Sequence, residues 1–285
     1  MPSPTFFLAG APKAGTTSLF RYLARHPDVA VARVKEPCYF APEVPVDAAT
    51  DVHRQSWPSY LALFADAGSR RAIGEGSVAY FSSATAPISI RERLPEARVL
   101  VMLRDPAERL FAHYAAARVA GITTGTFPQW VAAQQALEDQ RPARWGAVWA
   151  GCYATHLTRY RAHFAPDHLH IEYYDDFVRD PDRVLARVFQ FIGVDHTIRV
   201  DRSDRHNVTT TARFPRAMTS AARVIAEQAL PARAVDALRR WSRRPARMVA
   251  SPADRAHGIA LYRHEIAALS SMTGRDLTAW LSPSE

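Results

Sequence analysis

Short apolar runs alternate with segments of helical periodicity along most of the chain. The apolar runs predict buried strands at residues 5–9, 71–74, 98–103 and 169–174, with a further strand-like run at residues 29–34. Apolar residues recur at the spacing of helices in segments 16–26, 107–119, 153–164 and 182–192. This alternation predicts an α/β fold with a central parallel sheet flanked by helices on both faces.

The 285 residues divide into two parts that we treat as a single domain, 1–285. A core of about residues 5–215 holds the alternating elements, and the pattern becomes helical and rich in Arg and Ala over about residues 216–285. Near the end of this helical C-terminal part, residues 259–281 predict a helix, a stop at Gly274 and a short last helix that ends at Trp280. Neither an internal repeat nor a low-complexity linker separates the two parts.

Positive charge is carried almost entirely by arginine. Of the 36 Lys and Arg residues only Lys13 and Lys35 are lysines, and the formal net charge is +8. A basic balance indicates an anionic ligand, substrate or surface, although an Arg-rich composition alone also accounts for it. The densest basic cluster, residues 239–245, is more typical of a solvated helix end than of a binding patch, so no nucleic-acid partner is expected.

The two cysteines, Cys38 and Cys152, match neither a disulfide framework nor a metal-ligand spacing, so free thiols and no metal are expected. The N-terminal residues lack the basic region and the long apolar run of a signal peptide. No stretch approaches the roughly 18 apolar residues of a membrane span. The expected location is cytoplasmic, and the oligomeric state stays open, with a homodimer as one possibility.

Residues 10–18 follow a predicted strand and open a predicted helix, where free N–H groups and the positive end of the helix dipole suit an anion. Gly15 permits close backbone approach, and Thr16, Thr17 and Ser18 add hydroxyl donors. Lys13 is a point charge on a flexible stem that can reach the same anion. The alternative is a capped strand–turn–helix junction with an incidental lysine.

This loop is not a Walker A motif, in which the Lys directly follows a Gly and precedes Ser or Thr, because here Lys13 precedes Gly15 by two positions. The run from Pro12 to Leu19 instead resembles the 5′-phosphosulfate-binding loop of sulfotransferases that use 3′-phosphoadenosine 5′-phosphosulfate (PAPS). The match is closest to the branch of the heparan sulfate sulfotransferases and their bacterial relatives. The resemblance spans roughly residues 5–281. It implies a P-loop-like phosphosulfate-binding loop in which Lys13, Ala14, Gly15, Thr16, Thr17 and Ser18 bind the cofactor.

A second motif follows the predicted strand 98–103. Asp105 suits the cap of the next helix, and Arg104 at the strand end can donate two hydrogen bonds to a phosphate. The resemblance implies that Arg104 binds the 3′-phosphate together with a Ser eight residues later. Ala112 stands at that position, so one hydroxyl donor is missing. Two consequences stay open: a weaker affinity for the cofactor, or a shift of the role to His113 or another donor. The alternative for Arg104 is an ion pair with Asp105 or Glu108.

Sulfuryl transfer needs a base for the acceptor, cations for the transferring group and an in-line geometry. The resemblance places the catalytic base at Glu36 and assigns Lys13 to the bridging oxygen. The family commonly has a Lys where this chain has Gly76, and we propose that Lys35 supplies the missing charge. The alternative for Glu36 is a surface carboxylate paired with Lys35.

Further candidates are weaker. Cys38 stands where the family often has His or Gln, and His53 and His113 are second choices for the base. The resemblance places Tyr174 against the adenine, and it makes Arg213 and Arg216 phosphate contacts of a late cofactor loop. Candidates for an acceptor cleft are aromatic side chains that also suit a core, namely Tyr39, Phe40, Trp57, Tyr80, Phe81 and Trp145.

The resemblance thus implies a PAPS-dependent sulfotransferase, an enzyme of class EC 2.8.2. It would sulfate a hydroxyl or an amine of a small-molecule, lipid or glycan acceptor and release 3′-phosphoadenosine 5′-phosphate (PAP). Two alternatives stay open: a P-loop kinase-like phosphotransferase, and a non-catalytic protein that binds nucleotides or polyanions. The acceptor, and the choice between O- and N-sulfation, lie beyond the sequence.

Overall fold

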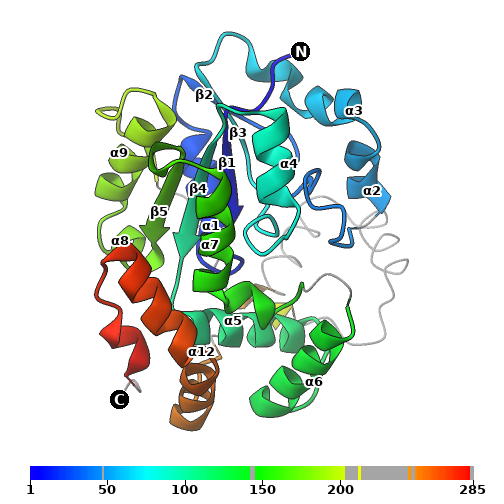
Figure 1. The fold of residues 1–285 in the computed structure, drawn as a ribbon, viewed down its shortest axis with the longest axis vertical. Coiled ribbons are helices and arrows are strands. Elements are labelled where there is room, and N and C mark those ends of the chain that lie inside the picture. Colours follow the sequence, from blue (N-terminus) through cyan, green and yellow to red (C-terminus); the bar gives the residue numbers. More distant parts are fainter. Residues whose placement is uncertain (47, 142–144, 203–210, 213–242, 245–247, 283–285) are drawn as a thin grey trace.

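The computed structural model contains a five-stranded parallel sheet with helices on both sides (Figure 1). It describes residues 1–46, 48–141, 145–202, 211–212, 243–244 and 248–282. The sheet has the order β2-β3-β1-β4-β5. Its strands are β1 (Phe6–Gly10), β2 (Val29–Val31), β3 (Ala72–Glu75), β4 (Arg98–Leu103) and β5 (Leu169–Tyr173). A separate antiparallel pair joins β6 (Thr211–Ala212) to β7 (Arg243–Arg244).

The helices alternate with the strands as the sequence predicted. The α-helices are α1 (Thr16–Leu23), α2 (Ala48–Asp51), α3 (Trp57–Leu61), α4 (Ala86–Arg93), α5 (Pro106–Val119), α6 (Phe127–Asp139), α7 (Tyr153–His163), α8 (Tyr174–Arg179), α9 (Pro181–Ile192) and α12 (Pro252–Thr273). Short 3₁₀ segments are η1 (Val52–Arg54), η2 (Ala62–Ala67), η3 (Trp149–Gly151), η4 (Pro166–His168) and η5 (Thr278–Leu281). Helices α4 and α7 cover one face of the sheet, while α1 and α9 cover the other (Figure 1). None of the helices in the described ranges is long and apolar enough to cross a membrane.

The central position of β1 explains why its sequence is apolar throughout. All five of its residues are buried, because β3 and β4 pair with it on either side and helices cover both faces. The predicted parallel α/β fold is confirmed, and four predicted strands match within one or two residues. The predicted strand 29–34 is shorter, since only Val29–Val31 pairs with β3. Helix α6 was not predicted.

The C-terminal helix begins earlier than the sequence pattern indicated. Ser251 caps α12 by accepting a hydrogen bond from the Asp254 amide, so the helix starts at Pro252 and the predicted start at residue 259 is wrong. The predicted stop is confirmed, because Gly274 ends α12 in the left-handed conformation at φ 67°. Most of the predicted helical part before α12, residues 216–242, lies outside the described residues.

Helix α12 packs directly on α5 and α7 (Figure 1). At the closest point Gly258 faces Ala107, and an ideal Cβ on Gly258 would lie 2.7 Å from the Ala107 Cβ. Nearby, the Tyr262 hydroxyl donates a hydrogen bond of 2.8 Å to the Val148 carbonyl. A side chain larger than hydrogen at residue 258 therefore has to move the two helices apart.

We expect Gly258→Leu to lower the free energy of unfolding by at least 1–3 kcal/mol, roughly the cost of overpacking a core. The matched control is Ala256→Leu on the exposed side of the same helix, which should change it by less than about 0.5 kcal/mol. Urea unfolding of both variants measures the difference. Equal stability of the two variants would contradict the tight contact between α12 and α5.

Candidate active site

Four segments that carry predicted site residues follow the carboxyl ends of strands of the parallel sheet. Lys35 and Glu36 follow β2, residues 11–15 follow β1, Arg104 follows β4 and Tyr174 follows β5. In a parallel α/β sheet this edge is where ligands bind. The predicted site residues of the described ranges therefore gather largely at one end of the sheet.

The loop after β1 turns into α1 at Gly15, whose φ of 85° is left-handed. An ideal Cβ on Gly15 would lie only 2.8 Å from Cδ2 of Tyr174, so the Tyr174 ring covers the Gly15 backbone. Among the described residues no side chain caps the start of α1. The Ser18 amide donates to the Gly15 carbonyl at 3.0 Å, so the amides that precede Ser18 in α1 are the ones that suit an anion. Thr16 is buried, whereas Thr17 and Ser18 are partly exposed.

Arg104 joins the second motif to this loop. Its Nη1 donates to the Lys13 carbonyl at 3.3 Å, and its guanidinium lies over the Tyr174 ring at 4.8 Å. Nε and Nη2 also bind Oε2 of Glu108, at 3.2 and 2.9 Å. The alternative ion pair with Glu108 is thus present, while Asp105 caps α5 and pairs with Arg255 instead. Tyr174 was expected against an adenine and lies between Gly15 and Arg104.

Positive charge accumulates around the loop. Lys13 presents an exposed side chain, yet neighbouring protein atoms displace enough solvent to lower the pKa of its ammonium. Arg109 is fully buried; its Nη2 reaches the Ala147 carbonyl and the Tyr262 hydroxyl, and Nε and Nη1 find no partner among the described residues. Burial, followed by the charges of Arg109 and Lys13, lowers the pKa of His113 to about 3. His113 is therefore neutral at physiological pH and a poor general base.

The structure also shows where two further predicted residues lie: His53, the other second choice for the base, and Ala112, which stands where the family has a Ser hydroxyl. Ala112 is half-buried in the second turn of α5, and His53 is half-buried on η1, in the segment between β2 and β3. Arg213 and Arg216 lie outside the described residues. Among the residues that the structure describes, no three His, Cys, Asp or Glu side chains gather as they would around a metal ion.

The segment that carries Glu36 lies along the segment that follows β3. The Glu36 amide donates to the Gly76 carbonyl at 2.9 Å, and the Val78 amide donates to Glu36 Oε2 at 2.7 Å. The Cys38 amide donates to Ser77 Oγ at 3.0 Å. The carboxylate of Glu36 is therefore held in one orientation, with φ of Glu36 in the left-handed region at 65°.

The segment that follows β3 also contacts the end of β1, where the loop of residues 11–15 (the phosphate loop) begins. An ideal Cβ on Gly10, the last residue of β1, would lie 3.3 Å from the Val78 carbonyl oxygen and 2.6 Å from Phe81 Cβ. The Phe81 amide also donates to the Ala9 carbonyl at 2.8 Å. Because Val78 holds Glu36 as well, Glu36 lies beside the end of β1.

Lys35 and Gly76 have separate explanations. Lys35 Nζ forms an ion pair with Glu36 Oε1, so the pairing held open as the alternative for Glu36 is present. An ideal Cβ on Gly76 would lie 2.8 Å from Cδ2 of Phe20, a buried side chain of α1. The Phe20 ring fills the space in which a lysine at residue 76 would begin.

The aromatic candidates separate into two groups. Phe40, Tyr80 and Phe81 are buried in the core. Tyr39 and Trp57 are half-buried and surround Tyr60, with ring centroids 4.5 and 5.3 Å from it. Trp145 is half-buried under the guanidinium of Arg141, 3.5 Å from the ring centroid. Only Tyr39, Trp57 and Trp145 thus keep partly exposed rings.

Glu75 is the group that the sequence did not assign. It is fully buried at the end of β3, and its Oε2 accepts hydrogen bonds from the hydroxyls of Tyr60 at 2.7 Å and Tyr80 at 2.9 Å. Burial raises the pKa of Glu75 to about 7, and the charge of Glu36 adds a smaller increment. The sequence signal that could have identified Glu75 is a carboxyl between two glycines at the end of an apolar strand.

Glu75 makes stability depend on pH. Its folded pKa of about 7 exceeds the ordinary 4.5, so its contribution is fully present below pH 4.5 and is lost as pH rises through 7. Glu75→Gln removes this titration. We expect its free energy of unfolding, relative to wild type, to improve by about 3 kcal/mol between pH 4.5 and 8. Urea unfolding at several pH values measures it, and a difference independent of pH would contradict the raised pKa.

Comparison with known proteins shows the family to which the chain belongs. Residues 3–216 match the family model described as "Sulfotransferase domain". The chain is similar to a crystal structure of a sulfotransferase from Alicyclobacillus acidocaldarius, with a TM-score of 0.77 and 25% identity over 99% of this chain and 100% of that chain.

Two curated relatives carry sulfotransferase activities in their names. The mouse bifunctional heparan sulfate N-deacetylase/N-sulfotransferase 4 is 27% identical over 67% of this chain and 22% of its own length. The human heparan sulfate glucosamine 3-O-sulfotransferase 6 is 27% identical over 71% of this chain and 55% of its own. The matches thus span about a fifth to about half of these relatives. Since the family model covers most of the chain, this protein belongs to the sulfotransferase family.

Proposed function

We propose that this protein is an enzyme that transfers the sulfuryl group of PAPS to a hydroxyl or an amine. The observation that carries the proposal is the meeting of two parts at one sheet edge. One part is an anion-binding loop with Lys13 and Arg104, and the other is a carboxylate, Glu36, fixed beside the end of β1. Family membership supports the reaction class.

The residues of the loop fit a phosphosulfate group. The uncapped start of α1 and the hydroxyls of Thr16, Thr17 and Ser18 offer donors, and the backbone of Ala14 and Gly15 would complete the loop around the anion. Arg104 would bind the 3′-phosphate and share its guanidinium with, or release it from, Glu108. Ala112 supplies no hydroxyl there, and Tyr174, Arg213 and Arg216 complete the proposed set of nucleotide contacts.

Bound PAPS supplies an activated sulfuryl group on a phosphate leaving group. Glu36 takes the proton of the acceptor hydroxyl or amine as the new S–O or S–N bond forms. Lys13 neutralises the charge that develops on the bridging oxygen as the old S–O bond breaks and PAP leaves. Lys35 adds a second positive charge next to the base, where Gly76 has none to offer.

The proposed acceptor is a small molecule, a lipid or a glycan. Names of curated relatives refer to heparan sulfate and glucosamine, which favours a glycan among these. Tyr39 and Trp57 are the partly exposed rings near the Glu36 segment that a sugar face would contact. The cytoplasmic location, the absence of a nucleic-acid partner and the homodimer stay predictions.

Nucleotide selectivity tests the donor. We expect PAP to raise the thermal midpoint of unfolding by several degrees, because a ligand that binds only the folded state stabilises it. ATP with magnesium should raise it little, since the loop lacks a Walker lysine. A larger shift with ATP and magnesium would favour the phosphotransferase alternative, and no shift with either would contradict nucleotide binding altogether.

Turnover of labelled PAPS with an acceptor panel tests the residues. We expect Glu36→Gln to lower kcat by roughly 10²–10⁴-fold, as for loss of a general base, and Lys13→Ala by about 10²–10³-fold. The exposed Glu92→Gln on α4 is the matched control and should leave kcat unchanged.

Lys35→Ala separates the roles of the two lysines. If Lys35 replaces the charge absent at Gly76, its loss should lower kcat at least about tenfold while the affinity for PAP stays unchanged. Near wild-type kcat in Lys35→Ala, with kcat lost in Lys13→Ala, would refute the proposed role of Lys35.

A further inference from the structure

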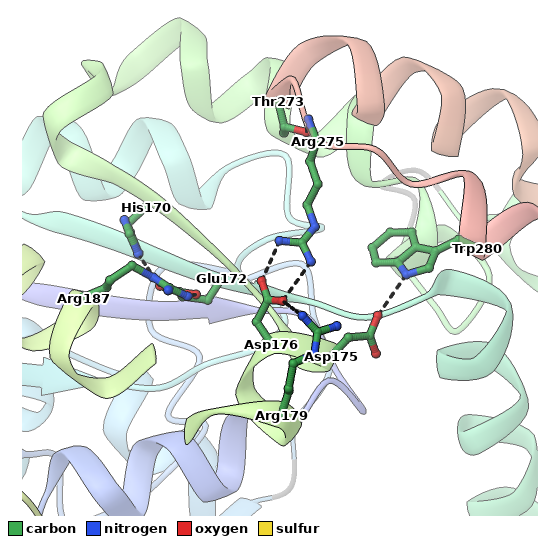
Figure 2. Close-up of polar contacts among 9 residues, drawn as sticks. All are labelled: His170, Glu172, Asp175, Asp176, Arg179, Arg187, Thr273, Arg275 and Trp280. Atoms are coloured by element: carbon green, nitrogen blue, oxygen red, sulfur yellow. Dashed lines mark hydrogen bonds and ion pairs between the residues drawn. The ribbon is translucent and has the colours of Figure 1, made fainter. Parts of the chain in front are cut away.

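Two side chains from the residues after α12 bind the short helix α8 (Figure 2). Arg275 binds Asp176 with both terminal nitrogens, at 2.6 and 3.1 Å. Trp280 Nε1 donates to Asp175 Oδ2 at 3.1 Å. A bidentate Arg–carboxylate pair fixes orientation as well as distance, so these contacts hold α8 from 99 residues further along the chain.

Helix α8 is only six residues long, and its first residue is Tyr174. The Tyr174 ring covers Gly15 and lies under the guanidinium of Arg104. Arg275 also lies over the ring of Tyr173, the residue before α8, with its guanidinium carbon 3.9 Å from the ring centroid. A shift of α8 would therefore move the ring against which both the phosphate loop and Arg104 rest.

Charges around the pair favour its ionised form. Hydrogen bonds from Arg275 lower the pKa of Asp176, and the same contacts raise the pKa of Arg275. Arg179 also reaches Asp176, but at 3.5 Å and with a largely exposed side chain. Helix α12 makes a second contact next to the predicted site, because Arg255 pairs with Asp105, the neighbour of Arg104.

We propose that Arg275 is a positioning residue for the donor nucleotide, acting through Asp176 and Tyr174 on the phosphate loop. This inference rests on the proposed function, because it takes the loop of residues 11–15 as the nucleotide site. The segment lies beyond residues 3–216, the part of the chain that the family model matches. It assigns to the C-terminal segment a role in donor affinity in addition to stability.

Figure 2 also contains a matched control. Arg187 of α9 binds Glu172 of β5 with two nitrogens at 2.8 and 2.6 Å, so it makes a second bidentate Arg–carboxylate pair near the end of β5. Its side chain is 36% exposed, compared with 33% for Arg275. The Arg187 pair ties α9 to β5, and towards Asp176 of α8 Arg187 contributes only its charge, as the smallest of the causes that lower the Asp176 pKa. Its loss should lower stability without moving Tyr174.

The test compares Arg275→Gln, Arg187→Gln and the exposed Arg179→Gln by calorimetric titration with PAP and by kinetics with PAPS. We expect Arg275→Gln to weaken PAP binding and raise the KM for PAPS about tenfold, while kcat at saturating PAPS stays within twofold. The two control variants should change PAP affinity less than twofold. Arg275→Lys should restore part of the affinity.

Equal affinity for PAP in Arg275→Gln and Arg187→Gln would overturn the proposal. If Arg275→Gln does not fold, Asp176→Asn removes the same pair from the other side and should give the same rise in KM. Hydrogen exchange of the amides of residues 11–15 tests the positioning role even if wild type binds no PAP. Failure of wild type to bind PAP would by itself refute only the proposed function. Faster exchange in Arg275→Gln than in Arg187→Gln supports the positioning role, and equal exchange overturns it.

Discussion

The site depends on one close contact, in which the ring of Tyr174 lies against the backbone of Gly15. A methyl group at residue 15 would collide with the ring, and the φ of 85° disfavours any side chain there. The contact fixes the turn from β1 into α1 and supplies the surface over which Arg104 lies. The two motifs proposed to bind the nucleotide, separated in the sequence by about 90 residues, therefore share one support.

The segment that carries Glu36 is attached to the same sheet edge by hydrogen bonds. Backbone amides of residues 36 and 38 bind the segment that follows β3, and the Val78 amide returns a hydrogen bond to the Glu36 carboxylate. Behind them, the buried Glu75 receives the hydroxyls of Tyr60 and Tyr80. Rigid backbone contacts of this kind would hold the proposed catalytic carboxylate in position before substrate arrives, which is what efficient catalysis requires.

Local sequence patterns predicted the parts of the structure that depend on local physics. Strands such as β1 and β4 were evident because helices cover both faces and leave only apolar positions. The loop at Gly15 and the cap at Asp105 were evident because conformational freedom and capping limit the residue types that fit. Their common location followed from the rule that the carboxyl ends of parallel strands meet at one edge.

Contacts between distant segments could not be predicted in this way. Nothing near Gly76 in the sequence indicates that Phe20 fills the adjoining space, and nothing near Asp176 indicates Arg275 as its partner. The start of α12 was placed too late because apolar spacing outweighed the Ser251 cap. The proposed roles of Glu36 and Lys13 come from the family resemblance, and the proposed role of Lys35 comes from the absence of a lysine at Gly76.

The most direct measurement is a crystal structure of this protein with PAP bound. We expect the 5′-phosphate on the amides and hydroxyls of residues 13–18, within reach of Lys13 and close to Glu36. We also expect Arg104 to contact the 3′-phosphate and the Tyr174 ring to stay against Gly15. A nucleotide bound elsewhere, or a 5′-phosphate remote from Glu36, would contradict the proposed site.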